Sequence, residues 1–218
     1  MNAEHTEYPE HTGREVTDVV FLHPTGRQPD SWTGVVRSLP AEVKPWLPNL
    51  GRGSFEEQRA AVESFLDKNE LRRVALVGHA MGAVTAVAVA AAQPQRITGL
   101  VLSQPQLFFD PSQVRNQIRA LKLMPKFLLR RTGLDKASAI AALEQVRHID
   151  LREQAKAITA PTLVLATTDE PVGLPSAEQA AEIIPGATLT KVSGLSGTWY
   201  ETDPARFVAE ISPHLGVG

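Results

Sequence analysis

One stretch, residues 73–94 with the sequence RVALVGHAMGAVTAVAVAAAQP, places the strongest constraint on how this chain folds. Its apolar, partly β-branched run from Val74 to Val77 is typical of a short buried strand. The tight turn Gly78-His79-Ala80-Met81-Gly82 follows, and an Ala- and Val-rich helical segment then ends before Pro94. A buried strand that leads through a glycine turn into a helix indicates a parallel sheet with crossover helices.

The same alternation of short apolar runs and helical patterns continues along most of the chain. Strands are expected at Val16–Leu22, Val43–Leu47, Arg73–Val77, Ile97–Leu102, Thr162–Thr167 and Ala187–Val192. Helices are expected around Trp32–Leu39, Phe55–Lys68, Ala80–Ala92, Ser176–Ile184 and Asp203–Leu215. The pattern predicts an α/β fold with a mostly parallel sheet of about six strands and helices on both faces.

The strand pattern is interrupted in the middle of the chain. Residues 104–157 show helical periodicity instead, which predicts a small helical cap inserted into a core of residues 16–103 and 158–218. Residues 1–15 are polar and are expected to form a flexible arm.

Composition narrows the range of functions. The chain has no cysteine, which excludes thiol catalysis, thiolate metal sites and disulfides. A net charge of −2 gives no electrostatic reason to expect a nucleic-acid partner.

No window approaches the roughly 18 apolar residues of a membrane span, so a cytoplasmic protein is expected. Neither metal-ligand spacing nor a dinucleotide fingerprint is present, so we expect no metal, no cofactor and a small-molecule ligand. The oligomeric state has no signature in the sequence.

Four segments, in order along the chain, carry a resemblance to a known family. They are FLHPTGRQPDSW, LPNLGRGS, LVGHAMGA and PTLVLATTDEPVGLP. They resemble the oxyanion loop, the glycine-rich loop, the nucleophile elbow and the acid-bearing loop of the α/β-hydrolase fold. The similarity extends from about residue 16 to residue 215 and implies that fold, with the inserted helices as its cap.

The resemblance also implies positions for the site residues. The family's elbow, G-x-S-x-G, presents a nucleophilic serine at its apex, and here that apex is Ala80. The backbone N–H groups of Thr25 and Met81 occupy the positions that form an oxyanion hole. Residues expected around the pocket are His23, Pro24, His79 and Trp199.

The remaining triad positions are also altered. Asp169 and Glu170 both lie where the family carries its acid. The loop VSGLSGTWYETDP, where the family carries its histidine base, contains no histidine, and Thr198 or Gly197 takes that place. His148, in the inserted helices, is the one substitute base that we considered.

Three functions therefore remain open from the sequence. The first is a divergent hydrolase-fold protein that binds a small apolar carbonyl-containing ligand and performs a cofactor-free, non-hydrolytic reaction of the cyclase or lyase type, with Asp169, Glu170 or a cap residue moving the proton. The second is a pseudoenzyme that only binds a ligand. The third is an ester, thioester or lactone hydrolase inactivated by Ser-to-Ala substitution at position 80.

Overall fold

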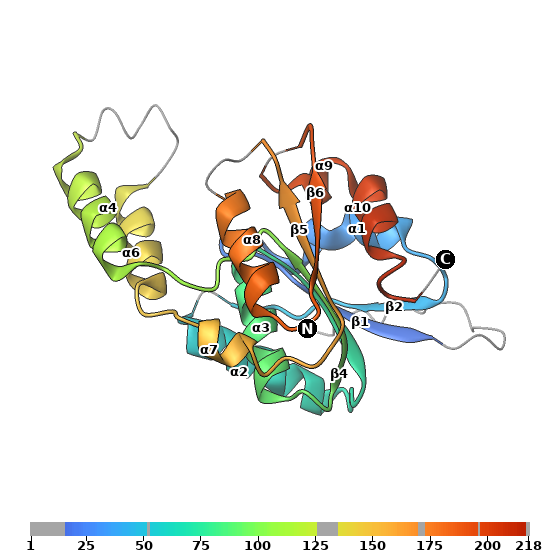
Figure 1. Cartoon of the computed structure of the whole chain (residues 1–218). Helices are drawn as coiled ribbons and strands as arrows, with labels where there is room; N and C mark the ends of the chain where they lie inside the picture. Colours follow the sequence, from blue (N-terminus) through green and yellow to red (C-terminus); the bar gives the residue numbers. More distant parts are fainter. Residues whose placement is uncertain (1–15, 52, 126–134, 170–172, 196, 217–218) are drawn as a thin grey trace, which may run out of the picture.

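A six-stranded sheet forms the centre of the chain. The computed structural model describes residues 16–51, 53–125, 135–169, 173–195 and 197–216. All strands of the sheet are parallel and lie in the order β2-β1-β3-β4-β5-β6 (Figure 1). The strands are β1 (Thr17–Leu22), β2 (Val43–Trp46), β3 (Val74–His79), β4 (Ile97–Ser103), β5 (Thr162–Thr167) and β6 (Thr188–Val192). The predicted parallel sheet is confirmed.

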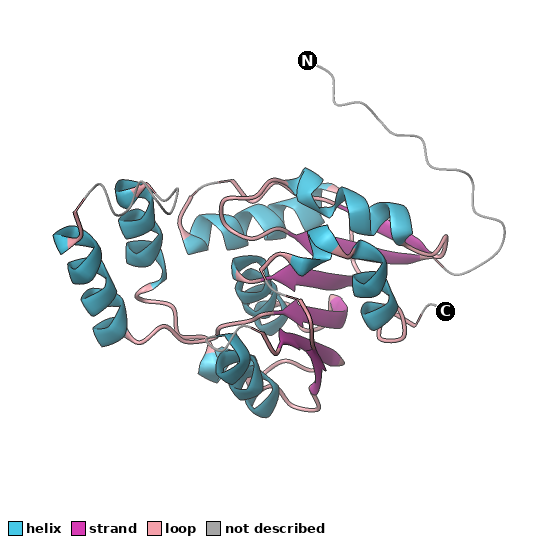
Figure 2. Cartoon of the chain, turned by 90° about the horizontal axis from the view of Figure 1, so that it is seen from above, coloured by secondary structure: helices cyan, strands magenta, loops and turns pink. Residues whose placement is uncertain are grey.

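Helices cover both faces of this sheet (Figures 1 and 2). The helices of the described residues are, in chain order, η1 (Pro29–Trp32), α1 (Thr33–Ser38), α2 (Phe55–Lys68), α3 (Met81–Ala92), α4 (Pro111–Leu123), α6 (Lys136–Val146), α7 (Arg152–Ala155), α8 (Gly173–Ile183), α9 (Trp199–Thr202) and α10 (Pro204–Ile211). One apolar core packs α2, α3, α7 and α8 against the sheet, and a second core packs η1, α1, α9 and α10 on the opposite face.

Strand β1 shows why the sheet has two cores. Val20 and Leu22 contribute to the first core, whereas Val19 and Phe21 contribute to the second. Successive side chains of a strand point to opposite faces, so a strand that is buried on both sides must be apolar at every position. This explains why the sequence shows continuous apolar runs rather than alternation.

Helices α2 and α10 illustrate how capping signals in the sequence start a helix. The Ser54 hydroxyl accepts a hydrogen bond from the Glu57 N–H, and the Glu57 carboxylate accepts one from the Ser54 N–H, which makes a capping box for α2. The Asp203 side chain accepts a hydrogen bond from the Arg206 N–H at the start of α10, with Pro204 in the first turn.

Several predicted boundaries were wrong. The helix after β3 begins at Met81 rather than Ala80, because Ala80 has a left-handed backbone. The helix predicted around Trp32–Leu39 is present as α1, with the short helix η1 directly before it, whereas the last helix ends at Ile211 rather than Leu215. The sequence did not predict α9.

The segment between β4 and β5 begins and ends at a two-stranded stem, formed by residues 107–109 and 149–151. The Leu151 N–H donates to the Leu107 carbonyl at 2.8 Å, and the Phe109 N–H donates to the Ile149 carbonyl at 3.2 Å. Beyond this stem, α4 and α6 pack against each other and stand to one side of the sheet (Figure 1). Within residues 104–157, α7 instead packs on α3 and α8 in the main body.

Candidate functional site

The turn between β3 and α3 has a strained backbone at its apex. Ala80 has φ 48° and ψ −115°, a conformation that residues with a Cβ rarely adopt. A Cβ on Gly78 would lie 2.5 Å from the carbonyl carbon of Gly82, and a Cβ on Gly82 would overlap the carbonyl oxygen of Leu22. Both glycines are therefore required for α3 to turn this sharply against the sheet.

The end of strand β4 holds this apex in place. The Ala80 N–H donates a hydrogen bond of 2.8 Å to the Ser103 carbonyl, and the His79 Nδ1 lies 3.0 Å from the Ser103 hydroxyl. Ser103 is fully buried and lines neither of the cavities described below, so its hydroxyl is a partner for His79 and offers no nucleophile to a ligand.

Two titratable side chains are buried next to the apex, and neither suits general base catalysis. Burial lowers the pKa of His79 to about 4, so its imidazole is neutral and only weakly basic. Burial raises the pKa of Tyr200 to about 12, so its phenol stays protonated. An effective general base needs a pKa near the working pH.

The loop after β1 carries Thr25, which lines the same two cavities as Ala80, described below. Its position is fixed by His23, whose Nε2 accepts a hydrogen bond of 3.1 Å from the Leu50 N–H. With Nε2 acting as an acceptor, the proton of the neutral ring lies on Nδ1, which donates to the Pro24 carbonyl at 3.1 Å. His23 thus joins the loop that carries Thr25 to the loop after β2.

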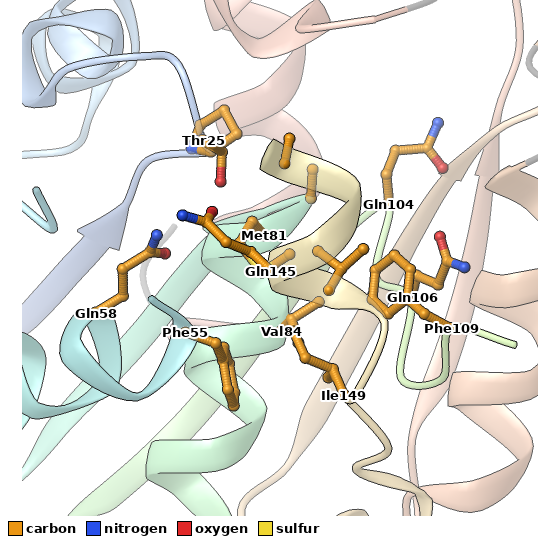
Figure 3. A pocket seen from close by; sticks show the side chains of 14 residues that line it. Thr25, Phe55, Gln58, Met81, Val84, Gln104, Gln106, Phe109, Gln145 and Ile149 are labelled. Atoms are coloured by element: carbon orange, nitrogen blue, oxygen red, sulfur yellow. The ribbon is translucent and has the colours of Figure 1, made fainter. Parts of the chain in front are cut away.

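A cavity of about 280 Å³ lies over the apex and the first turns of α3, which we call the elbow cavity. Side chains from α2, α3, α6 and the loop after β4 converge on it (Figure 3). Its described lining is apolar except for Thr25 and four glutamines, and it contains no titratable side chain. The lining residues are Pro24, Thr25, Phe55, Gln58, Ala80, Met81, Val84, Gln104, Gln106, Phe109, Ala142, Gln145, Val146 and Ile149.

A second hollow of about 320 Å³ adjoins the elbow cavity, and we call it the Arg27 hollow. The two spaces share Pro24, Thr25, Ala80 and Gln104. The Arg27 hollow adds Gly26, Arg27, His79, Gly197 and Thr198. Both spaces thus adjoin Ala80, at the carboxyl edge of a parallel sheet, where ligands bind in open α/β folds.

Comparison with known proteins identifies the family to which this chain belongs. Residues 19–210 match the family described as Alpha/beta hydrolase family. The chain belongs to this family. The fold predicted from the sequence, an α/β-hydrolase fold, is confirmed.

Individual hydrolase relatives are distant. Over 119 residues the chain is 29% identical to Lipase LipV of Mycobacterium tuberculosis, and the matched region covers 50% of this chain and 45% of that lipase. The enol-lactonase of Burkholderia xenovorans LB400 has a TM-score of 0.72 at 18% identity, with 94% of each chain covered. MenH from S. aureus has a TM-score of 0.72 at 17% identity, with 95% of this chain and 96% of that chain covered. The two structures establish the likeness of fold alone.

Asp169, Thr198 and His148, three of the positions considered for the acid and the base, do not line the elbow cavity. Asp169 is exposed, accepts a hydrogen bond from the Thr168 hydroxyl at 3.1 Å, and lines neither space. Glu170 lies outside the described residues. Thr198 precedes α9 and lines the Arg27 hollow. The His148 ring, also exposed, accepts a hydrogen bond from Arg147 at 2.8 Å and lines neither space.

The residues predicted to surround the pocket have different roles in the structure. Pro24 lines both spaces, and His79 lines the Arg27 hollow. His23 is buried behind the loop that it anchors. Trp199 is fully buried in the second core, where its ring centroid lies 4.9 Å from that of Phe207, and it lines neither space.

Sequence reasoning missed two residues that border the apex. Gln104 lines both spaces and has φ 54°, which makes it a second strained residue without glycine's freedom. Arg27 projects into the Arg27 hollow from the predicted oxyanion loop. The one indication in the sequence was position: Arg27 follows Thr25 in the predicted oxyanion loop, and Gln104 lies shortly after a predicted strand.

Two further observations concern possible partners. Among the described residues, every helix is too short or too polar to span a membrane. The same residues contain no group of three or more histidine or carboxylate side chains placed to hold a metal ion.

Proposed function

We propose that this member of the alpha/beta hydrolase family binds a small, largely apolar, carbonyl-containing molecule in the elbow cavity and does not hydrolyse esters through a Ser-His-acid triad. The observation that carries the proposal is Ala80 at the apex of the elbow. A methyl group has no lone pair and cannot attack a carbonyl carbon.

Binding remains possible because it needs only the backbone around the apex. The N–H of Met81 lies in the first turn of α3, where helix amides have no partner within the helix. Together with the Thr25 N–H, it is the proposed donor to a ligand oxygen. We further propose that residues 104–157 act as the cap, since α6 and the stem contribute Gln145 and Ile149 to the lining.

The character of the lining favours binding over proton-transfer chemistry. The described walls of the elbow cavity hold no group that exchanges a proton near neutral pH. A cyclase or lyase reaction would therefore need a proton carrier from elsewhere, and Asp169 faces solvent. This supports a ligand-binding pseudoenzyme as the preferred function of the two non-hydrolytic alternatives.

Hydrolysis of 4-nitrophenyl butyrate by four proteins tests the proposal against an inactivated hydrolase. The proteins are the natural chain, Ala80→Ser, Ala80→Ser combined with Thr198→His, and Ala80→Ser combined with Thr168→His. The last variant places its histidine on the exposed Thr168 as a control.

We expect the natural chain, Ala80→Ser and the Thr168→His control to remain at the background rate. Activity limited to the Thr198→His variant, or absent from all four, supports loss of the triad. Hydrolysis by Ala80→Ser alone would show that an intact base is present and would overturn the proposal in favour of the inactivated hydrolase.

A further inference from the structure

We propose that the ligand is an organic carboxylate whose head lies beside Ala80 and is held by Arg27, while its apolar body fills the elbow cavity. The inference rests on the proposed function, because it assigns a ligand class to that same site. It uses the junction of the two spaces at Ala80, Thr25, Pro24 and Gln104.

The guanidinium of Arg27 has two partners among the described residues and retains further donors. Its Nε lies 2.9 Å from a Glu201 carboxylate oxygen, and one terminal nitrogen donates to the Thr198 hydroxyl at 3.4 Å. A guanidinium has five N–H donors, so donors on its terminal nitrogens remain unpaired among the described residues. The side chain is 48% exposed, as expected for a group at the mouth of a hollow.

The charges around the junction favour an anion. Arg27 is the one charged side chain in the described lining of the two spaces. His79, which also lines the Arg27 hollow, is neutral because burial holds its pKa at about 4. Glu201 is already paired with Arg27, and Asp169 is exposed outside both linings. A carboxylate beside Ala80 therefore meets a cation and no facing carboxylate in the described lining.

The elbow cavity suits the uncharged remainder of such a ligand. Phe55, Val84 and Phe109 give it an apolar surface. In Figure 3 the amide groups of Gln58 and Gln145 lie on one side of this surface, and those of Gln104 and Gln106 lie on the other. Carboxamides both donate and accept hydrogen bonds without charge, so they accommodate neutral polar atoms on an apolar body.

A purely structural role for Arg27 is the competing explanation. In that case its contacts with Glu201 and Thr198 would only fasten the loop after β1 to α9. The two explanations differ for Glu201→Gln, which removes the ion pair and leaves the guanidinium in place. If Arg27 only joins the loop to α9, loss of the ion pair should lower the stability of the chain and any binding that depends on the loop. If Arg27 binds a carboxylate, loss of the ion pair leaves the guanidinium available and removes the Glu201 charge that pairs with it.

The experiment is calorimetric titration with 4-phenylbutanoate, methyl 4-phenylbutanoate and 4-phenylbutanamide, which share one apolar body. The proteins are the natural chain, Arg27→Gln, Glu201→Gln and Arg37→Gln. The last is a control, because Arg37 is an exposed arginine of α1 that lines neither space. Thermal unfolding of each protein verifies that it is folded.

We expect the natural chain to bind the acid more tightly than the ester and the amide. Arg27→Gln should weaken binding of the acid by about ten- to a hundredfold, the range for a charge-assisted hydrogen bond, and change the ester by less than about threefold. Glu201→Gln and Arg37→Gln should keep the affinity for the acid. If Arg27→Gln does not fold, the same proposal requires that added salt weaken the acid in the natural chain and leave the ester unchanged.

Two results would contradict the inference in different ways. Equal binding of acid, ester and amide, unaffected by Arg27→Gln or by salt, would overturn the carboxylate assignment and leave the proposed binding function standing. Absence of binding by all three compounds would overturn both. Equal loss of acid binding in Arg27→Gln and Glu201→Gln would assign Arg27 a structural role.

Discussion

Acid should destabilise this fold through His79, at a pH where most carboxylates are still ionised. Burial lowers the pKa of His79 from 6.5 to about 4 in the folded chain. Between these values the unfolded chain binds a proton that the folded chain does not, so stability present above pH 6.5 is lost as the pH falls toward 4. At about 1.4 kcal/mol for each tenfold difference in proton affinity, the full loss is about 3 kcal/mol, and about 2 kcal/mol of it occurs between pH 7.5 and 5.

Urea unfolding of the natural chain and of His79→Gln, at pH 7.5 and at pH 5, measures the contribution of His79 to this loss of stability. Glutamine can still hydrogen-bond with Ser103 but does not titrate, so the pH dependence of the variant contains every group except His79. We expect the natural chain to lose about 2 kcal/mol more than His79→Gln between pH 7.5 and 5. Equal losses in the two proteins would refute the reasoning. If His79→Gln does not fold, NMR titration of the His79 ring in the natural chain gives the same answer.

Four substitutions test the local geometry, each by thermal or urea unfolding. Gly82→Ala should prevent folding or destabilise the chain by several kcal/mol, because its Cβ overlaps the Leu22 carbonyl, whereas Gly99→Ala meets its nearest neighbour at 3.7 Å and should be tolerated. Asp203→Ala should cost about 1 kcal/mol through loss of the α10 cap. Ala80→Gly should stabilise the chain by up to about 1 kcal/mol, because strain relief at φ 48° exceeds the added freedom of the unfolded backbone; destabilisation would show that the apex is unstrained.

The sheet was predictable because it is buried on both faces. Continuous apolar runs gave all six strands to within one or two residues at each end, and glycine spacing located Ala80 at the apex. Side-chain direction in loops and short helices was not predictable from the same patterns. Asp169 turns toward solvent and Trp199 turns into the second core, because the packing of distant segments decides each orientation.

The amide-rich lining of the elbow cavity was also not predictable from the sequence, because its residues come from separate segments. Gln58, Gln104, Gln106 and Gln145 come from α2, the loop after β4, and α6, so no local motif contains more than two of them. Each is an ordinary surface-type residue when read alone. The fold brings these separate segments to one space, and α6 contributes Gln145 to it.

The strain at Ala80 bears on what the site does. A residue with a Cβ at φ 48° costs free energy, and strained conformations persist only where the surroundings impose them. Here the small residues Gly78 and Gly82 and the Ser103 carbonyl impose it, and the apex carries no nucleophile to justify it. The strained turn ends at Met81, the first residue of α3, which lines the elbow cavity. Under the proposed function the Met81 N–H donates to a ligand oxygen, so the turn would serve recognition of that oxygen rather than attack on a carbonyl carbon.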